Sequence, residues 1–476
     1  DSRRSALEFV CGVEGAAPGY ERRKKQFRNA LQCLGTWHTD PLCRPLPSPR
    51  DLAGVVQILT ESSMSASKTL LLIAGLTETT TKLGAYVFAR SDFMRASYEA
   101  TIGGRLTTLG KAGERKPRVG LALSGGGSRA IAFHLGCLRA LHDRGVLDQL
   151  QVVSAVSGGS VIAALYMYSG LGFDQFEAAV LELLRHGLAK RALNALGFGG
   201  IGVESLLTSA LSGIAAAGAR MVSRQPPLRR WRSRTHALEQ ALDGVFGGLL
   251  LSAPTRNNVP VVFNACELRT GNAFRYQSGR TACSSLGVSE HDTKLAHAVA
   301  ASAAYPVFLP AFDEEAVFSR KGKQRTIITD GGVFDNLGIS CMEPGRDERF
   351  SEHVFRPEYI ICCNAGQGPL DNEHIPYGMY SRVSRSMEVI FKKVQDAAMH
   401  RLHQQVASQQ LKGFILPYLG QNDKALPYGP PDLVPRAEVA NYPTNFSAMK
   451  ERDIKLLSTR GEQLTAYLLS YYMPDL

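Results

Sequence analysis

The chain contains Leu121-Ala-Leu-Ser124-Gly125-Gly126-Gly127-Ser128-Arg129, an apolar, strand-like run that ends in three glycines before a helix-like segment. Glycine allows backbone conformations that other residues avoid, so successive N–H groups can turn toward one point. Such N–H groups can stabilise the oxyanion of an acyl-transfer intermediate. The run therefore predicts an oxyanion hole formed by Gly125, Gly126 and Gly127.

A phosphate site is the alternative interpretation of these glycines, because N–H groups at the start of a helix also bind anions. The segment lacks the Lys-Ser or Lys-Thr pair of a P-loop and the spacing of a dinucleotide-binding turn. The oxyanion interpretation is therefore preferred.

A candidate nucleophile lies in Ser154-Ala-Val-Ser157-Gly-Gly-Ser160, which has the pattern of a sharp strand-to-helix turn. In a Gly-x-Ser-x-Gly turn the central serine projects its hydroxyl from the end of the strand. Ala155 replaces the first glycine, a change of one methyl group. Ser157 is the predicted nucleophile, and Ser154 and Ser160 are the alternatives, either as helix caps or as the nucleophile itself.

A candidate base follows Ile327-Ile-Thr329 in the form of Asp330, which precedes two glycines. An Asp before Gly is commonly a turn residue, so this assignment depends on the other two motifs. A carboxylate at the end of a strand could take the hydroxyl proton of Ser157. Together the three motifs predict a serine acyl hydrolase with a Ser157/Asp330 dyad.

The histidines downstream of Asp330 do not fit a Ser-Asp-His triad. An ordinary α/β hydrolase places its catalytic histidine after the acid. The candidates are His353, His374, His400 and His403, and none follows a clear strand end. The sequence therefore favours a base that acts without histidine.

Short apolar segments alternate with helical ones from residue 118 onward. The predicted strands are 119–124, 152–156, 260–265, 326–329, 359–363 and 414–417. Strands separated by helices indicate an α/β fold with a mainly parallel sheet covered on both faces. Ligands of such sheets bind at the carboxyl ends of the strands, where the glycine run and Ser157 fall.

Composition sets the broad class of the protein. The 476 residues are 44% apolar, enough for a large core, and 54 Lys and Arg against 43 Asp and Glu give a net charge of +11. This charge favours anionic partners such as phospholipid headgroups. Nine cysteines without CxxC pairs or metal-ligand spacing indicate free thiols, and we expect no metal and no cofactor.

Two regions flank or interrupt the predicted catalytic domain of residues 117–476. Residues 1–116 are expected to be mostly helical, with no role indicated. Residues 170–243 read as a cap or lid insertion, in which an uncharged run and an Arg-rich segment with one Trp span residues 206–234. This segment suits peripheral association with an anionic membrane, and the alternative is a core helix followed by a solvated charged turn. One Trp offers little surface for base stacking, so no nucleic acid is expected.

No run of 18 apolar residues is present, which predicts a cytoplasmic or peripheral membrane protein. Because the chain begins with Asp1 rather than Met, secretion stays open.

Four ordered motifs between residues 118 and 366 resemble the patatin-like phospholipase family, including its bacterial members and the related group IV cytosolic phospholipases. They are Ser124-Gly-Gly-Gly-Ser-Arg129, Ala155-Val-Ser157-Gly-Gly159, Ala301-Ser-Ala-Ala-Tyr-Pro306 and Asp330-Gly-Gly-Val-Phe-Asp-Asn336. The resemblance implies a three-layer α/β/α fold and a lipid ester as substrate.

The same resemblance assigns roles to individual residues. Ser157 would attack the ester with Asp330 as general base, and Gly126 and Gly127 would donate to the oxyanion with Gly125 close by. Arg129 would bind phosphate or stabilise charge. The alternatives are a general carboxylesterase, triacylglycerol lipase or thioesterase, and a noncatalytic module that binds lipid surfaces.

Overall fold

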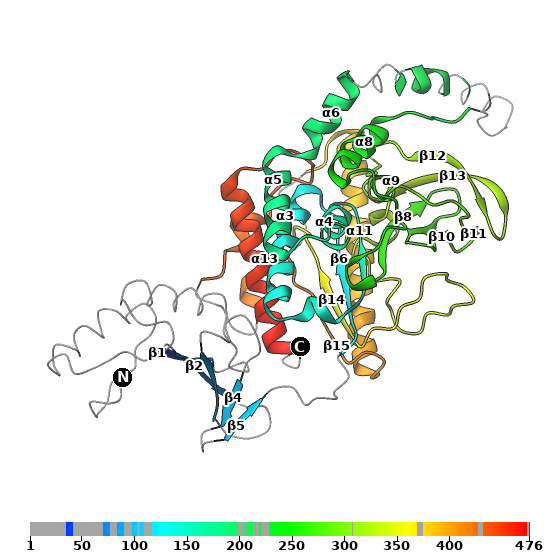
Figure 1. Cartoon of the computed structure of the whole chain (residues 1–476). Helices are drawn as coiled ribbons and strands as arrows, with labels where there is room; N and C mark the ends of the chain where they lie inside the picture. Colours follow the sequence, from blue (N-terminus) through cyan, green and yellow to red (C-terminus); the bar gives the residue numbers. More distant parts are fainter. Residues whose placement is uncertain are drawn as a thin grey trace. The chain divides into compact units, whose positions relative to one another are not determined.

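The computed structural model of the chain is shown in Figure 1. It describes residues 117–198, 228–306, 308–368, 375–426 and 432–473 together with shorter pieces at 35–40, 70–76, 83–89, 98–101, 105–108, 204–205, 207–212, 215, 219 and 476. The chain divides into two compact units, one of residues 1–116 with 469–476 and one of residues 117–468.

The described segments of residues 1–116 are strands. They are β1 (Gly35–Asp40), β2 (Leu70–Leu76), β3 (Leu83–Ala89), β4 (Tyr98–Thr101) and β5 (Arg105–Thr108), paired in that order. These segments are strands rather than helices, and the expectation that residues 1–116 are mostly helical stays a prediction because the rest of the region lies outside the described residues. Apolar runs of seven residues with Tyr, Val and Phe, as in β3, fit a pleated surface better than a helix.

A parallel sheet forms the centre of the second unit and confirms the predicted α/β class. Its strands are β8 (Val261–Glu267), β7 (Leu150–Ala155), β6 (Val119–Leu123), β14 (Tyr359–Cys363) and β15 (Gly413–Ile415), in this spatial order. Each neighbouring pair is parallel. All five correspond to predicted strands.

An antiparallel part of the sheet joins both edges of β8, with β9 on one edge and β13 on the other, and it was not predicted as such. It consists of β9 (Asn272–Tyr276), β10 (Ala282–Cys283), β11 (Gly287–Val288), β12 (Phe312–Phe318) and β13 (Gly322–Asp330). The predicted strand 326–329 lies in β13, which runs antiparallel to β8 and ends at Asp330.

Helices cover both faces of the sheet, which makes three layers. Ala398 and Leu402 of α11 (Gly378–Ala407) pack in one core cluster with Ala122, Ile360 and Cys362, which lie on β6 and β14. Alternate residues of a strand point to opposite faces.

The other face of the sheet is turned toward α3 (Gly127–Asp143), because His134 of this helix contacts the carbonyl of Cys363 in β14. The helices α4 (Gly158–Tyr168), α5 (Phe173–His186) and α13 (Glu451–Tyr472) accompany α3 in Figure 1. Arg139 of α3 forms ion pairs with Glu177 of α5 and Glu462 of α13, so these three helices are neighbours.

The second unit contains five further α-helices with given bounds among the residues that the structure describes. They are α6 (Leu188–Phe198), α8 (Arg234–Phe246), α9 (Leu295–Ser302), α10 (Gly332–Asp335) and α12 (Arg436–Val439). Of the predicted 170–243 insertion, α5 buries Phe176 and Val180 in the domain, whereas much of 199–227 lies outside the described residues. Whether the insertion acts as a cap stays a prediction.

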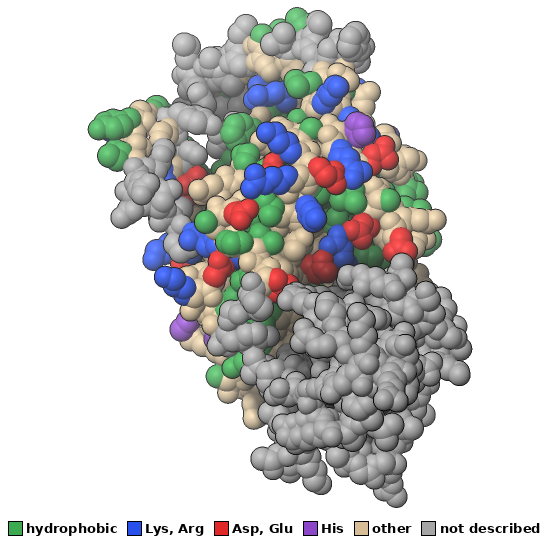
Figure 2. Space-filling view, turned by 90° about the vertical axis from the view of Figure 1, so that its left-hand side faces the viewer, with side chains coloured by type: hydrophobic (Ala, Val, Ile, Leu, Met, Phe, Trp, Pro, Cys, Tyr) green, Lys and Arg blue, Asp and Glu red, His purple; other side chains and the backbone are tan. Residues whose placement is uncertain are grey.

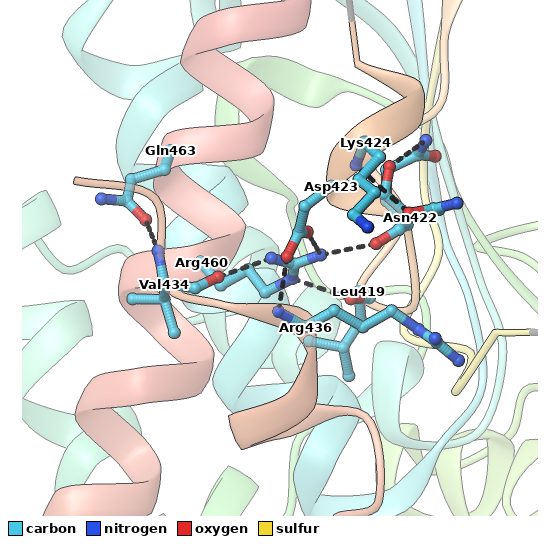
Figure 3. A network of polar contacts seen from close by, with 9 residues as sticks. Leu419, Asn422, Asp423, Lys424, Val434, Arg436, Arg460 and Gln463 are labelled. Atoms are coloured by element: carbon cyan, nitrogen blue, oxygen red, sulfur yellow. Dashed lines mark hydrogen bonds and ion pairs between the residues drawn. The ribbon is translucent and has the colours of Figure 1, made fainter. Parts of the chain in front are cut away.

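The C-terminal helix α13 is fixed to the domain by backbone contact and by a buried arginine. A Cβ on Gly461 would lie 2.1 Å from the carbonyl oxygen of Phe133, so α3 and α13 touch at this glycine. Arg460 is fully buried and donates to the carbonyls of Leu419 and Gln421, each at 2.8 Å (Figure 3). The Arg460 guanidinium also pairs with the Asp423 carboxylate at 2.8 Å, which compensates its burial.

Candidate active site

Sheet topology brings the ends of two strands together beside β8. Phe263 of β8 pairs with Ala155 of β7 on one edge and with β9 on the other, and Ala265 pairs with Asp330 of β13 and again with β9. Both β7 and β13 therefore lie along the edge of β8 opposite β9. Since β7 is parallel and β13 is antiparallel to β8, the carboxyl ends of β7 and β13 face each other. The β8 residues that pair with these two ends, Phe263 and Ala265, are two positions apart, which is about 7 Å along β8.

The predicted nucleophile and base meet at this junction. The Ser157 side chain lies close enough to the Asp330 carboxylate to lower its pKa through hydrogen bonding. Asp330 also accepts the N–H of Gly332 at 2.6 Å. Both side chains are buried, Ser157 at 8% exposure and Asp330 at 3%. The structure thus places a hydroxyl and a carboxylate in contact inside a site with little water.

Ser157 occupies a sharp turn between β7 and α4. Its φ of 51° and ψ of −120° lie where residues other than glycine are rare. Close packing of the backbone imposes this conformation, because a Cβ on Gly158 would lie 2.2 Å from the Gly127 oxygen and one on Gly159 would lie 2.3 Å from the Leu123 oxygen. The crowded positions are therefore these two glycines, which explains why Ala155 is accommodated in place of the first glycine.

The alternative serines are occupied by other contacts. The Ser154 hydroxyl donates to the carbonyl of Gly338, and the Ser160 hydroxyl is bonded to that of Ser302 at 2.8 Å. The Ser157 side chain makes no capping bond to the helix that follows it. Among the three serines, Ser157 is the one whose hydroxyl faces a carboxylate.

Burial changes the acidity of the candidate base. Removal from water raises the pKa of Asp330 to about 7, against the opposing effect of hydrogen bonds from the Gly332 N–H and the Ser157 hydroxyl. A carboxylate with this pKa is a stronger base than an exposed aspartate and is still ionised above neutral pH.

The glycine turn after β6 lies beside the nucleophile. A Cβ on Gly125 would be 3.4 Å from the Cβ of Ser157. The Gly125 N–H donates to the carbonyl of Asn336 at 3.2 Å, whereas the N–H groups of Gly126 and Gly127 have no acceptor among the described residues. With φ angles of 145° and 59°, both have conformations suited to glycine. The N–H groups of Gly126 and Gly127 are therefore available as donors. The N–H of Gly125 is not, because its bond to Asn336 holds the turn in place.

Arg129 lies behind this turn in the first turn of α3. Its guanidinium donates to the carbonyls of Ala365 at 2.9 Å and Tyr442 at 2.8 Å. Burial lowers the pKa of Arg129 to about 10, a value that still leaves it charged at neutral pH. Its Nη2 lies 3.4 Å from the position that a Cβ on Gly126 would occupy. A buried positive charge thus stands next to the free N–H donors.

Ser302 is a site residue that sequence reasoning did not single out. At the end of α9, its hydroxyl accepts the N–H of Ser157 at 3.0 Å, and its carbonyl accepts the N–H of Gly331 at 3.3 Å. The carbonyl of Ala304 accepts the N–H of Asp330 at 3.1 Å. One short segment therefore holds both partners. The sequence did contain a sign of Ser302, because it lies in the motif Ala301–Pro306. The family resemblance includes this motif but gives its residues no role.

The downstream histidines lie away from the dyad. His353 is buried against the carbonyl of Arg280, and its pKa is lowered to about 3 by burial and nearby arginines. His400 contacts Gln404, and the ring of His403 contacts Phe414. In the part of the chain that the structure covers, none of the three contacts Ser157 or Asp330, and His374 lies outside it.

The surface of the molecule mixes both signs of charge. On the face shown in Figure 2, Lys and Arg side chains are interspersed with Asp and Glu, so the net positive charge forms no single block there. About half of segment 206–234 lies outside the described residues, and Trp231 in its described part is exposed. No helix within the described residues is long and apolar enough to cross a membrane.

Comparison with known proteins adds the following. A sequence model of the family described as Patatin-like phospholipase matches residues 121–340. No curated protein sequence matches the chain.

Among solved structures, VipD from Legionella pneumophila is similar at 12% identity over 79% of this chain and 68% of VipD, with a TM-score of 0.32. Human GIVD cytosolic phospholipase A2 in complex with a methyl gamma-linolenyl fluorophosphonate inhibitor is 13% identical over 74% of this chain and 58% of that one, with a TM-score of 0.43. The type III effector protein ExoU is 13% identical over 84% of this chain and 56% of that one, with a TM-score of 0.28. The chain thus spans only part of each structure.

Proposed function

We propose that this protein, whose residues 121–340 match the sequence model of the patatin-like phospholipase family, is a lipid acyl hydrolase that cleaves carboxylic esters through Ser157 and Asp330. The observation that supports the proposal is the placement of these two buried side chains at the junction of β7 and β13, where Ala155 and Asp330 pair with positions of β8 that are two residues apart. A phospholipid, cleaved in the manner of a phospholipase A or lysophospholipase, is the substrate that the family suggests.

The first half of the reaction forms an acyl-enzyme. The Asp330 carboxylate takes the proton of the Ser157 hydroxyl as the serine oxygen attacks the ester carbonyl. The carbonyl oxygen becomes an oxyanion and accepts hydrogen bonds from the N–H groups of Gly126 and Gly127. The intermediate then collapses, the bond to the alcohol breaks, and the departing oxygen takes the proton back from Asp330.

The second half releases the fatty acid. A water molecule gives a proton to Asp330 as its oxygen attacks the acyl carbon, and collapse of the second intermediate returns this proton to the Ser157 oxygen. Each N–H donor to the oxyanion contributes roughly 3 kcal/mol to transition-state stabilisation. The positive charge of Arg129 next to Gly126 adds to the field that favours the oxyanion. Since Arg129 is almost fully buried, we propose this role for it ahead of direct contact with a phosphate headgroup.

Fluorophosphonate labelling tests the activated serine directly, because only an activated serine reacts. The wild-type protein should be labelled and should release fatty acid from phospholipid vesicles. Both signals should disappear in Ser157→Ala, and turnover should fall by at least about a thousandfold in Asp330→Asn.

His403→Ala serves as a control that should keep most activity, because His403 lies on α11 away from the dyad. Retained labelling in Ser157→Ala would contradict the assignment. An unlabelled wild-type protein would favour a noncatalytic module that binds lipid surfaces.

Substrate class is settled by comparing phospholipids with other esters. A general carboxylesterase, triacylglycerol lipase or thioesterase would turn over chromogenic esters, triacylglycerol or thioesters in preference to phospholipid. Mass analysis of products from mixed lipids, with Ser157→Ala as the blank, separates these possibilities. We also propose that the protein acts at the surface of a membrane, and segment 206–234 is one candidate for the contact.

A further inference from the structure

Helix α11 is much longer than the sheet that it covers. Its 30 residues span about 45 Å, whereas the five residues of β14 span about 17 Å. Ala398 and Leu402, in its second half, pack into the core. From residue 378 to 397, none of the side chains that the structure describes is buried. The first half of α11 therefore has no protein layer over most of its circumference.

This first half begins at the edge of the sheet where the site lies. The chain enters α11 after β14 and leaves it for β15, which is parallel to β14. The helix therefore runs from the carboxyl edge of the sheet back to the amino edge. Ser157 and the glycine turn follow β7 and β6 at the same carboxyl edge.

The exposed half of α11 carries an apolar stripe. Met379, Val383, Ile390 and Val394 are exposed and fall within an arc of about 60° around the helix. Met379 is 85% exposed, the highest value among the exposed large apolar side chains that the structure describes.

Apolar side chains that adjoin the catalytic strands extend the stripe. The ring of Phe391 on α11 contacts Tyr305, which stacks on Phe308 with ring centroids 6.0 Å apart. Tyr305 directly follows Ala304, whose carbonyl holds the N–H of Asp330. Phe334 lies on α10, which contacts α11. Phe308 and Phe334 are both exposed.

Charges on this half of the helix match an anionic surface. Arg382 and Lys393 are exposed and lie on one flank of the stripe. The acids Glu388 and Asp396 lie outside the apolar arc and pair with Arg385 and Lys392 on the helix itself. An apolar stripe with cations beside it is the arrangement of helices that lie in the headgroup region of anionic bilayers.

We propose that the first half of α11, together with Phe308 and Phe334, is the surface that docks this protein onto an anionic phospholipid bilayer, with the carboxyl edge of the parallel strands, where Ser157 lies, facing the lipid. The inference rests on the proposed function and deepens it, since it states that the substrate is taken from an aggregate. A second copy of the chain or another protein on the same face would be a different occupant.

Vesicle flotation with the full-length chain tests this surface. The binding assay uses Ser157→Ala as background, so that hydrolysis does not alter the vesicles, and it uses phosphatidylcholine vesicles with and without phosphatidylglycerol. Ile390→Asp should weaken binding to the phosphatidylglycerol vesicles by about tenfold or more, because it places a charge in the apolar boundary. Phosphatidylglycerol should strengthen binding of the parent.

Val389→Asp is the matched control. It introduces the same charge one residue away, at a side chain that is 42% exposed compared with 52% for Ile390, but about 100° around the helix. It should weaken binding by clearly less than Ile390→Asp does, and this smaller loss should disappear on vesicles without phosphatidylglycerol, because Val389 lies outside the apolar arc but one turn before Lys393 of the cationic flank. Equal losses in both variants, or no loss in Ile390→Asp, would overturn the proposed surface. So would a change from oligomer to monomer in Ile390→Asp with vesicle binding intact, which would assign the face to a second copy.

Turnover of a soluble short-chain ester separates the two proposals. With an otherwise wild-type site, Ile390→Asp and Val389→Asp should both keep this turnover within about twofold, which also shows that they fold. Vesicle binding that depends on Ile390 in a protein without any esterase activity would refute the proposed hydrolase and leave the surface standing. Normal esterase activity with vesicle binding independent of Ile390 would do the reverse.

Discussion

Asp330 carries the property on which the proposed chemistry depends most, a carboxylate buried without a cationic partner at hydrogen-bonding distance. Burial raises its pKa to about 7, and the hydrogen bonds from Gly332 and Ser157 offset only part of that effect. The same burial that makes Asp330 a competent base also makes its charged form costly for the folded protein. Two expectations follow at this single residue, one for activity and one for stability.

Activity should follow the ionisation of Asp330. Because the base must be ionised to take the Ser157 proton, kcat/KM for a soluble ester should be low at pH 5, rise through about pH 7 and level off above it. A pH profile of initial rates measures this. A profile already flat between pH 5 and 8 would contradict a base with this pKa.

Stability should change in the opposite direction with pH. The pKa of Asp330 is about 7 in the folded protein and near 3.8 when unfolded, so the folded state binds the proton more tightly. The resulting destabilisation is absent below pH 3.8, grows as pH rises, and is complete above pH 7, where it reaches as much as about 4 kcal/mol. Asp330→Asn should therefore raise the melting temperature at pH 8 by several degrees, while abolishing activity.

Thermal unfolding of wild type and Asp330→Asn at several pH values provides the test. The difference between the two proteins should shrink steadily from pH 8 to pH 4. A variant that is less stable than wild type at pH 8 would show that the charged carboxylate is better solvated than its surroundings indicate.

Among the elements, α9 organises the site although it contributes no reacting group. Ser302 and Ala304, at and just beyond its carboxyl end, hold the backbone of Ser157 and Asp330. The helix itself is anchored by His297, which lies between Glu239 of α8 and Glu314 of β12 at 3.4 and 3.3 Å. Although burial opposes its charge, these carboxylates raise the pKa of His297 to about 10, so the pairing persists at neutral pH.

Removing the Ser302 hydroxyl should affect turnover more than binding. Ser302→Ala leaves the N–H of Ser157 without its acceptor and frees the Ser160 hydroxyl, so the strained turn should lose its fixed orientation. We expect kcat for a soluble ester to fall roughly tenfold with KM changed less than about twofold. A parallel rise in KM with unchanged kcat would indicate that Ser302 shapes the binding site instead.

Among the secondary-structure elements, those with a clear sequence pattern were predicted, and those without one were not. The buried strands β6, β7, β8 and β14 are nearly continuous apolar runs, and the helices after the glycines and after Ser157 follow turn residues that mark their starts. By contrast β12, Phe-Asp-Glu-Glu-Ala-Val-Phe, carries acids that hide its strand character. β12 becomes a strand because it pairs with β13, and no local sequence pattern encodes this pairing.

The residues of the proposed site could be named from the sequence, but the contacts that hold them in place could not. Ser157, Asp330 and the glycine turn stood out because their chemistry needs unusual local sequence. The engagement of the Gly125 N–H by Asn336, and the bond from Ser157 to Ser302, join residues more than 140 positions apart. Such contacts depend on the whole fold, and a single sequence contains no sign of them.

For the whole molecule, the contact between α3 and α13 joins the start of the domain to its end. A Cβ on Gly461 would meet the Phe133 oxygen at 2.1 Å, and one on Gly136 would meet the Ser458 oxygen at 1.7 Å. Because these neighbours are backbone atoms of helices, they cannot move aside without separating the layer. The contact should therefore limit the stability of the entire domain.

Replacing one of these glycines should reveal this limit. Gly461→Ala should destabilise the domain by several kcal/mol, even though Ala is the better helix former by about 1 kcal/mol. Gly244→Ala is the matched control, because Gly244 lies inside α8 with no atom within 4 Å of the added methyl group, and it should be neutral or slightly stabilising. Denaturant unfolding compares the two. Equal stability of both variants would show that α13 can shift without cost.

The end-to-end meeting of β7 and β13 along β8 has a consequence for how this architecture can vary. The distance between nucleophile and base is set by β8, because the two strand ends pair with Phe263 and Ala265, two residues apart. This distance does not depend on the length of the chain segment between Ser157 and Asp330. That segment can become longer or shorter or be replaced during evolution while the distance between Ser157 and Asp330 stays the same. A single residue inserted at Asn264 would instead turn β13 over and carry Asp330 to the wrong side of the sheet.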